Sequence, residues 1–300
     1  MTLPRVLFIV GQTAVGKTAL SLSVAQQVGG EIISADSRQI YRHMHIGTAK
    51  ATAAERAHVP HHMLDIVDPS DTYTLAQYRD AALSHIHAIH ARGHLPMVVG
   101  GTGQYVAALL EGWSIPEIPP NDALRAQLEA RAASEGGAAL YAQLQSLDPE
   151  AARQIHATNV RRIIRALEVC LSTGQQFSQL RQAQPLTFAP VVVWLTCDTP
   201  TLYARIDARV DTMLATGLPA EVLHLRGMGY GWELPAMSGI GYREFQPWCE
   251  GTADLNAVAE RIKFNTHAFA RRQATWFRRW QCVQTHAGDV AGVVRVCMGA

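Results

Sequence analysis

The sequence predicts an α/β fold, in which a P-loop-type parallel sheet is flanked by helices and carries an inserted all-helical domain. Three observations lead to this prediction. A glycine-rich loop directly follows the short apolar run Val6–Val10. Short apolar runs then alternate with helical patterns over the first third of the chain, which is typical of parallel sheets. Finally, the residues between two proline-rich stretches have helical periodicity and contain no strand-like run.

The glycine-rich loop predicts a phosphate-binding site. It precedes a helical pattern that starts at Thr18, so backbone amides and a helix N-terminus point at one anion. Lys17 adds a mobile positive charge, and the Thr18 hydroxyl can ligate Mg²⁺. A chance match to the motif is the alternative, at odds on the order of one in a hundred. The residues expected to hold the phosphates are Gly11, Gln12, Thr13, Ala14, Val15, Gly16, Lys17 and Thr18.

A second glycine-rich turn, Gly100–Gly103, lies where a nucleotide hydrolase normally carries a second acid. The apolar run Leu95–Val99 leads directly into this turn, and no residue there is suited to activating water. The turn backbone and the Thr102 hydroxyl can instead approach the same phosphates. The alternative is a tight turn that uses glycine for its geometry alone.

Asp36 is the candidate general base. It follows the apolar run Glu31–Ala35, and ligands of open α/β sheets gather at the carboxyl ends of the strands. For an isolated Asp-Ser pair, a helix N-cap is the simpler interpretation. The flanking segments Ser37–Tyr41 and His45–Lys50 favour the functional one.

The order of patterns predicts a first part of the P-loop core at 1–114, a helical insertion at 115–189 and a second core part at 190–300. Two proline-rich segments, 115–122 and 182–190, are expected to act as stiff hinges. The expected strands are 5–10, 31–35, 95–99 and 191–195, and the expected helices are 74–91, 121–134, 138–147, 160–171 and 254–280.

Composition excludes several classes of protein. The chain has 300 residues, 48% of them hydrophobic and 17% charged, which is ordinary for a globular protein. No run approaches the roughly 20 apolar residues of a membrane span, and the N-terminus lacks a secretory pattern, so we expect a cytoplasmic location and no membrane partner. Five widely spaced cysteines support neither a disulfide framework nor a zinc site. A net charge of +1 does not indicate a nucleic-acid binder, although it can hide local basic surfaces.

Four histidines, His85, His87, His90 and His94, invite a metal interpretation. No acidic partner accompanies them at a motif spacing, so we expect a stripe of histidines facing solvent.

At this point the chain closely resembles the bacterial tRNA dimethylallyltransferases, the tRNA isopentenyltransferases of the IPP transferase family. The resemblance rests on ordered motifs between about residues 5 and 280: the two glycine-rich turns, Ile-Ile-Ser-Ala-Asp-Ser-Arg-Gln-Ile-Tyr, Ile-Gly-Thr-Ala-Lys, His-His-Met-Leu-Asp-Ile-Val-Asp-Pro, Arg-Ala-Leu-Glu-Val and Arg-Arg-Gln-Ala-Thr-Trp-Phe-Arg. Each motif is weak alone, but the set is highly specific.

The resemblance implies transfer of a dimethylallyl group from dimethylallyl diphosphate to N6 of the adenine just 3′ of the anticodon. It also implies that the phosphate loop holds the diphosphate with Mg²⁺ and that no ATP is consumed. Asp36 would then be the base, Thr102 would orient the bridging oxygen or hold the donor, and Arg209 would contact the diphosphate. For Arg209, the alternative is a surface arginine paired with Asp207 or Asp211, although neither lies at a favourable helical spacing. The enzyme is expected to be monomeric.

The tRNA anticodon stem-loop is the implied partner, and the target base must leave its stack to enter the pocket. A basic face at residues 161–165 is expected on the insertion, opposite apolar positions, although arginines on a helix are commonplace. The family pattern is altered at His267 and Ala268, which leaves individual phosphate contacts on the C-terminal helix open. The residues expected to contact tRNA are Asp36, Ser37, Arg38, Gln39, Thr102, Arg125, Arg161, Arg162, Arg165, Gly241, Tyr242 and Arg243.

Three other functions remain as alternatives. The first is an isopentenyltransferase acting on free AMP or ADP, against which the helical insertion argues, since a small nucleotide needs no such arm. The second is a small-molecule kinase, which requires ATP. The third is a non-catalytic tRNA- or nucleotide-binding module, against which the presence of Asp36, Thr102 and Arg209 argues.

Overall fold

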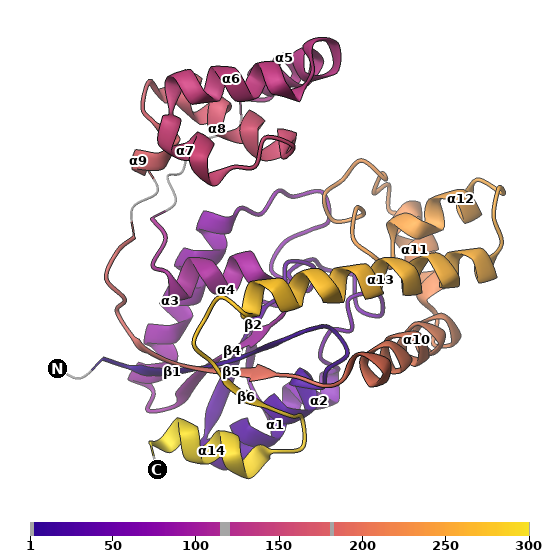
Figure 1. Cartoon of the computed structure of the whole chain (residues 1–300). Coiled ribbons are helices and arrows are strands. Elements are labelled where there is room, and N and C mark those ends of the chain that lie inside the picture. Colours follow the sequence, from indigo (N-terminus) through magenta and orange to yellow (C-terminus); the bar gives the residue numbers. More distant parts are fainter. Residues whose placement is uncertain (1–2, 115–120, 181–182, 300) are drawn as a thin grey trace. The chain divides into compact units, whose positions relative to one another are not determined.

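The computed structural model describes residues 3–114, 121–180 and 183–299. The chain divides into two compact units (Figure 1). The core unit consists of Met1–Leu110 and Leu186–Ala300, and the helical unit is Glu111–Pro185. Most of the first expected hinge, at 115–120, and Gln182 of the second lie outside the described residues.

A parallel six-stranded sheet forms the centre of the core unit, with the strand order β3-β2-β4-β1-β5-β6. The pairs within it are all parallel, as expected for strands joined by helical crossovers. The predicted P-loop-type α/β fold is therefore confirmed. The two edge strands were not predicted, because they are too short to show a pattern. The strands are β1 (Arg5–Gly11), β2 (Gly30–Ala35), β3 (His61–His62), β4 (Leu95–Gly100), β5 (Ala189–Leu195) and β6 (Val283–Thr285).

Helices cover both faces of this sheet (Figure 1). On one face, α3, α4 and the C-terminal half of α13 pack against Phe8, Val10 and Val98. On the other face, α1, α10 and α14 pack against Leu7 and Ile9. The core-unit helices are α1 (Lys17–Val28), α2 (Ala53–His58), α3 (Leu75–Ala91), α4 (Gly103–Leu110), α10 (Thr199–Ala215), α11 (Leu218–Gly227), the 3-10 turn η1 (Arg243–Phe245), α12 (Gln246–Cys249), α13 (Leu255–Phe277) and α14 (Val290–Met298).

A third apolar cluster supports the loops beyond the carboxyl ends of the strands. It joins Ile40 and Met44 to Leu218, Val222 and Tyr242. The segment after β2 is thus anchored to α11 and to the loop before η1, which lie far away in the sequence.

The helical unit contains only helices among its described elements and has a core of its own. The predicted helices at 121–134, 138–147 and 160–171 are present with slightly shifted ends. The elements are α5 (Asp122–Glu135), α6 (Gly137–Leu147), α7 (Pro149–Gln154), α8 (Val160–Thr173) and α9 (Phe177–Leu180).

The four histidines of the predicted stripe largely face solvent, since His87, His90 and His94 are exposed and His85 is half-buried. His94 is exposed, but its Nδ1 lies 2.7 Å from Oε1 of buried Glu31, whose other oxygen binds Arg92 and His62. The ring of His62 in turn lies 4.5 Å from that of His85. Burial alone raises the pKa of Glu31, but hydrogen bonds from Arg92, His62 and His94 bring it down to about 2. An acid distant in sequence is therefore the partner of His94, together with Arg92 and His62.

Within the described ranges, no group of three or more His, Cys, Asp or Glu side chains is placed to hold a metal ion. The same part of the chain contains no helix with the length and apolarity needed to cross a bilayer.

Candidate functional site

The phosphate loop connects β1 to α1 in the core unit. Gly16 precedes α1 with a φ of 104°, a left-handed conformation that glycine adopts without strain. No side chain of the described residues caps the start of this helix, so its first amides are available to a bound anion. The Thr18 side chain is exposed and lines the adjoining cavity.

Two positive charges lie at this loop. Lys17 Nζ donates to the carbonyl oxygens of Gly11 and Gln12, at 2.9 and 2.7 Å. Burial, and then the nearby charge of Arg209, lower the pKa of Lys17 to about 8, while Asp36 opposes the shift. Arg209 reaches the loop from α10, and its Nη1 lies 3.4 Å from the Thr13 hydroxyl.

Within the described residues Arg209 forms no ion pair with Asp207 or Asp211, which argues against the alternative interpretation of Arg209. Asp211 binds Lys263 at 2.8 Å, and Asp207 lies 2.9 Å from His267. His267, which departs from the family pattern, also stacks on Tyr203 with ring centroids 4.0 Å apart. Its role in this structure is thus to connect α13 with α10.

The adjacent strands β2 and β4 end beside the loop and bring Asp36 and Thr102 together. The Thr102 hydroxyl accepts a hydrogen bond from Ser37 N–H at 3.1 Å. One oxygen of Asp36 accepts from Arg38 N–H at 2.8 Å, which orients the carboxylate in the manner of an N-cap. This bond does not prevent Asp36 from acting as a general base, because the carboxylate keeps further lone pairs that can accept a proton.

A cavity of about 400 Å³ connects these groups. Its walls include Asp36 and Gln39 after β2, Lys17 and Thr18 of the phosphate loop, and Arg209. A carboxylate and an anion-binding loop thus face the same space. Thr102 is not among the residues that line it, but its hydroxyl contacts Ser37, the residue after Asp36.

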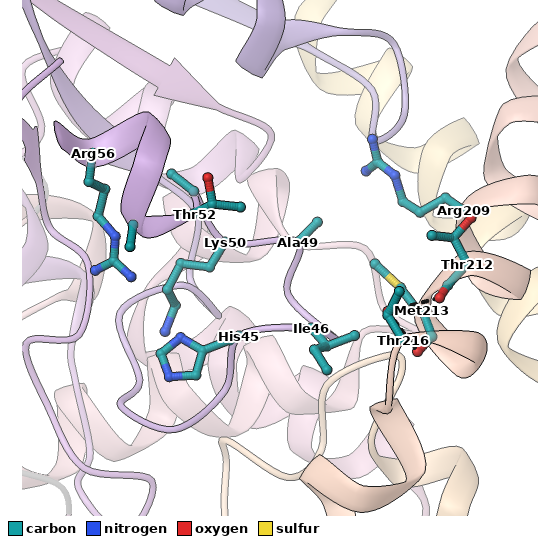
Figure 2. Close-up of a pocket in the computed structure, with 12 residues that line it drawn as sticks. His45, Ile46, Ala49, Lys50, Thr52, Arg56, Arg209, Thr212, Met213 and Thr216 are labelled. Carbon is teal, nitrogen blue, oxygen red and sulfur yellow. Dashed lines mark hydrogen bonds between the residues drawn. The ribbon is translucent and has the colours of Figure 1, made fainter. Parts of the chain in front are cut away.

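A wider cavity of about 620 Å³ adjoins the first and shares Arg209, Ala49 and Ala51 with it (Figure 2). Its walls are loop 45–53 together with α2 on one side and α10 on the other. Apart from Arg209, the α10 side presents Thr212, Met213 and Thr216.

The loop 45–50 is held by a carboxylate that the sequence patterns did not reveal. Glu221 on α11 accepts hydrogen bonds from the N–H groups of His45, Ile46 and Gly47, at 2.9, 2.7 and 3.1 Å. It also accepts from the Tyr242 hydroxyl at 2.7 Å. A lone glutamate on a short helix carries no signal that its donors lie on a loop 176 positions away.

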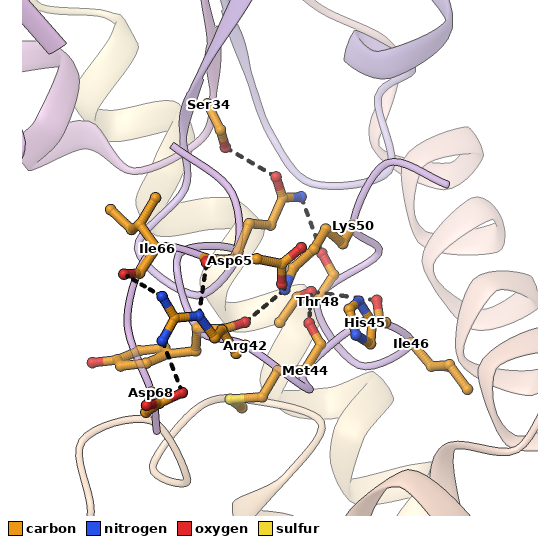
Figure 3. A network of polar contacts seen from close by, with 12 residues as sticks. Ser34, Arg42, Met44, His45, Ile46, Thr48, Lys50, Asp65, Ile66 and Asp68 are labelled. Atoms are coloured by element: carbon orange, nitrogen blue, oxygen red, sulfur yellow. Dashed lines mark hydrogen bonds and ion pairs between the residues drawn. The ribbon is translucent and has the colours of Figure 1, made fainter. Parts of the chain in front are cut away.

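Further hydrogen bonds connect the same loop to β2 and to the segment after β3 (Figure 3). Gln39 accepts from the Ser34 hydroxyl at 2.9 Å and donates to Thr48 O at 3.2 Å. Lys50 Nζ binds Asp65 and the Tyr41 carbonyl, each at 2.6 Å. Gln39, predicted to contact tRNA, therefore also has a structural role.

Among the other predicted tRNA contacts of the core unit, Arg38 extends to the segment before Gly241. Its guanidinium contacts Pro235 O and the Ser238 hydroxyl. Arg243 is exposed and its Nε donates to Glu244 at 2.9 Å. Tyr242 is completely buried, so its side chain offers no surface to a nucleic acid, and that predicted contact needs correction.

In the helical unit, Glu168 is buried and binds two of the predicted arginines. Its carboxylate lies 3.0 Å from Arg125 and 2.9 Å from Arg165. Burial raises the pKa of Glu168, but its hydrogen bonds, led by that from Arg165, lower it overall. Arg161 and Arg162 begin the same helix, are exposed and have no side-chain partner within the described residues.

Comparison with known proteins identifies the family. The sequence model of the IPP transferase family matches residues 39–280, and that of isopentenyl transferase matches residues 4–66. A tRNA dimethylallyltransferase of Roseiflexus sp. is 57% identical over 94% of this chain and 93% of its own length, and one of Chloroflexus aggregans is 56% identical over 90% and 92%.

Solved structures agree with the sequence matches. A tRNA isopentenylpyrophosphate transferase of Bacillus halodurans superposes with a TM-score of 0.73 at 38% identity, over 98% of this chain and 96% of that one. A eukaryotic dimethylallyltransferase acting on tRNA gives 0.79 at 29% identity, over 96% and 75%. The described chain thus belongs to the IPP transferase family.

Proposed function

We propose that this enzyme transfers a dimethylallyl group from dimethylallyl diphosphate to N6 of adenosine 37 in tRNA, 3′ of the anticodon, and releases diphosphate. Two findings support the proposal. The relatives are tRNA dimethylallyltransferases, and one cavity exposes both an anion-binding loop and the carboxylate of Asp36. The shared cavity is the main support for this function, because the prenyl donor and the acceptor base must bind next to each other.

Cleavage of the allylic carbon–oxygen bond places negative charge on the departing diphosphate. The amides at the start of α1, Lys17 and Arg209 are positioned to stabilise that charge. Thr102 is assigned to orient the donor. The N6 amine is a poor nucleophile, so a carboxylate that accepts its proton as the new bond forms assists the attack. We propose that Asp36 is the carboxylate that accepts this proton.

Mg²⁺ is proposed as the metal, and the residues present fit it. Thr18 lines the cavity and its hydroxyl would supply one oxygen ligand, and Mg²⁺ usually keeps several waters and substrate phosphate oxygens. When bound, the ion neutralises part of the charge on the diphosphate.

The helical unit is proposed to bind the anticodon stem-loop through Arg161 and Arg162, with Arg125 and Arg165 as half-exposed neighbours. The base has to be extruded at a cost of a few kcal/mol, which backbone contacts offset. We propose that the enzyme acts as a monomer, which sedimentation at working concentration checks.

The test is an incubation of the protein with Mg²⁺, dimethylallyl diphosphate and an unmodified anticodon stem-loop, followed by nucleoside analysis. Prenylated adenosine at the target position and equimolar diphosphate are expected, and chelation of the metal should suppress both. Preferred transfer to AMP or ADP would support the first alternative function, and ATP-dependent phosphorylation the second. Absence of any transfer would support the third alternative, a non-catalytic tRNA- or nucleotide-binding module.

Asp36→Asn tests the proposed base. Removal of a general base typically lowers the rate about 10²- to 10⁴-fold, so we expect a loss in that range in single-turnover rate with donor binding retained. Asp80→Asn, on the exposed side of α3, is the matched control. Equal single-turnover rates for Asp36→Asn and the wild type would remove Asp36 from this role.

A further inference from the structure

Gln273 lies on the buried side of α13, where helical periodicity places apolar side chains. Only 4% of the residue is exposed, and its neighbours Ala270, Ala274 and Phe277 belong to the core. A polar amide at such a position is costly unless both of its ends are hydrogen-bonded. Both ends are bonded here.

The amide joins the two glycine-rich turns. Its Oε1 accepts from Thr13 N–H at 2.8 Å, and its Nε2 donates to Gly101 O at 2.9 Å. Thr13 belongs to the phosphate loop after β1, and Gly101 directly precedes Thr102 in the turn after β4. A single rigid group therefore spans the two backbone segments that flank the cavity.

Two further observations show that α13 packs tightly against both glycine-rich turns. An added Cβ on Gly101 would lie 2.3 Å from Nε2 of Gln273, so only glycine lets the turn approach the amide. One turn earlier on α13, Ala270 O accepts from the Gln12 side chain at 3.2 Å. The helix is thus bonded to the phosphate loop at two successive turns.

Gln273 does not line either of the two cavities described above. Any effect of Gln273 on the reaction is therefore expected to pass through the turns that it holds. Thr102 is bonded both to Ala35 O through its N–H, at 3.0 Å, and to Ser37 N–H. The position of the turn at Gly101 is therefore transmitted to the segment that carries Asp36.

We propose that Gln273 is a positioning residue, which sets the distance between the donor, held by the phosphate loop and oriented by Thr102, and the acceptor amine at Asp36. This inference rests on the proposed function. Only a side chain of this length that both donates and accepts can make the bridge. An ionised glutamate lacks the donor, whereas a protonated glutamate has both a carbonyl oxygen and an O–H group.

The test compares Gln273→Met, which fills similar space without either bond, and Gln273→Glu with the wild type. Single-turnover rate, donor and stem-loop affinity and thermal stability are measured at a temperature where every variant is folded. For Gln273→Met we expect a rate about 10- to 100-fold lower, because small displacements of reacting groups have effects of that size. The stem-loop affinity should stay within about twofold of the wild type, since the arginines of the helical unit are untouched.

The pH profile provides a readout that a purely structural role would not move. As pH falls, Gln273→Glu becomes protonated and regains both bonds, so its rate divided by that of the wild type should rise. The same ratio for Gln273→Met should stay low and flat. Thr275→Val, which removes a hydroxyl from the exposed face of the same helix, should match the wild type throughout.

Folded Gln273→Met with a single-turnover rate within twofold of the wild type would overturn the inference, as would a pH-independent ratio for Gln273→Glu. If Gln273→Met does not fold, the pH-dependent ratio for Gln273→Glu decides alone. A wild-type protein that transfers no prenyl group would instead contradict the proposed function, and with it this role.

Discussion

In the core unit, the groups around the cavity are held by partners far away in the sequence, whereas the helical unit holds its arginines through a partner within its own contiguous segment. Gln273 binds backbone atoms 260 and 172 positions away, and Glu221 binds the loop at His45 across 176 positions. In the helical unit, Glu168 binds Arg165 three positions away and Arg125 at a separation of 43.

The two units should therefore respond differently to substitution. The chemistry of the core unit depends on the correct packing of α11 and α13, so substitutions outside the cavity can slow the reaction. The basic face of α8 depends mainly on its own helix, so substitutions there should change tRNA affinity while leaving the chemical step intact. Three predictions test this contrast, from the largest expected effect to the smallest.

Glu221→Gln should slow the reaction although the residue is not among those lining either cavity. An amide presents an NH₂ group to N–H donors, so at least one bond to loop 45–47 is replaced by an unfavourable contact. Losing a bond between an ionised acceptor and backbone amides costs about 1.5–3 kcal/mol, and we expect kcat/KM to fall about 10- to 100-fold. Steady-state kinetics at a temperature where the variant is folded checks this.

Two further variants provide a comparison for the effect of Glu221→Gln on kcat/KM. Tyr242→Phe removes only one of the four bonds to Glu221 and should have a smaller effect. Glu233→Gln is an exposed control on the neighbouring segment. If Glu221→Gln matched Glu233→Gln in kcat/KM, the loop would not require its long-range anchor, and the contrast between the two units would fail.

Replacing both Arg161 and Arg162 with Gln should weaken stem-loop binding without changing the single-turnover rate at saturation. For each arginine–phosphate interaction that is removed, the slope of log affinity against log salt should become shallower by about 0.7 to 0.9. Titrations at several salt concentrations measure this slope. Arg153→Gln is the matched control, because Arg153 is exposed in the same unit but paired with Glu150. An unchanged slope would mean that the basic face of α8 does not touch tRNA.

Donor binding should weaken as pH rises through the pKa of Lys17. Because this pKa is lowered to about 8, the amine is mostly charged at pH 7 and mostly neutral at pH 9. If only the charged form binds, the donor Kd should rise about fourfold between pH 7 and pH 8.5. Calorimetric or fluorescence titration checks it. Lys17→Arg should remove the pH dependence, since arginine stays charged, and a wild-type Kd that is flat over this range would contradict the shift.

Much of the fold was predictable because its signals are local. The strands β1, β2, β4 and β5 are apolar runs, and α3 and α13 have regular apolar spacing over many residues. The phosphate loop was predictable for the same reason, as its residues are contiguous. The edge strands β3 and β6 were missed because two or three residues carry no periodicity.

The sequence by itself determined the four longer strands, several long helices, the phosphate loop, the motifs that resemble the family and the candidates Asp36, Thr102 and Arg209. Only the tertiary structure decided how they are held: that Glu221 anchors loop 45–47, that Gln273 bridges the two turns, that Glu31 binds His62 and His94, and that Tyr242 is buried. The physical reason is that a hydrogen bond depends on the separation of two atoms in space, and a single sequence contains no record of separations that arise only when distant segments pack together.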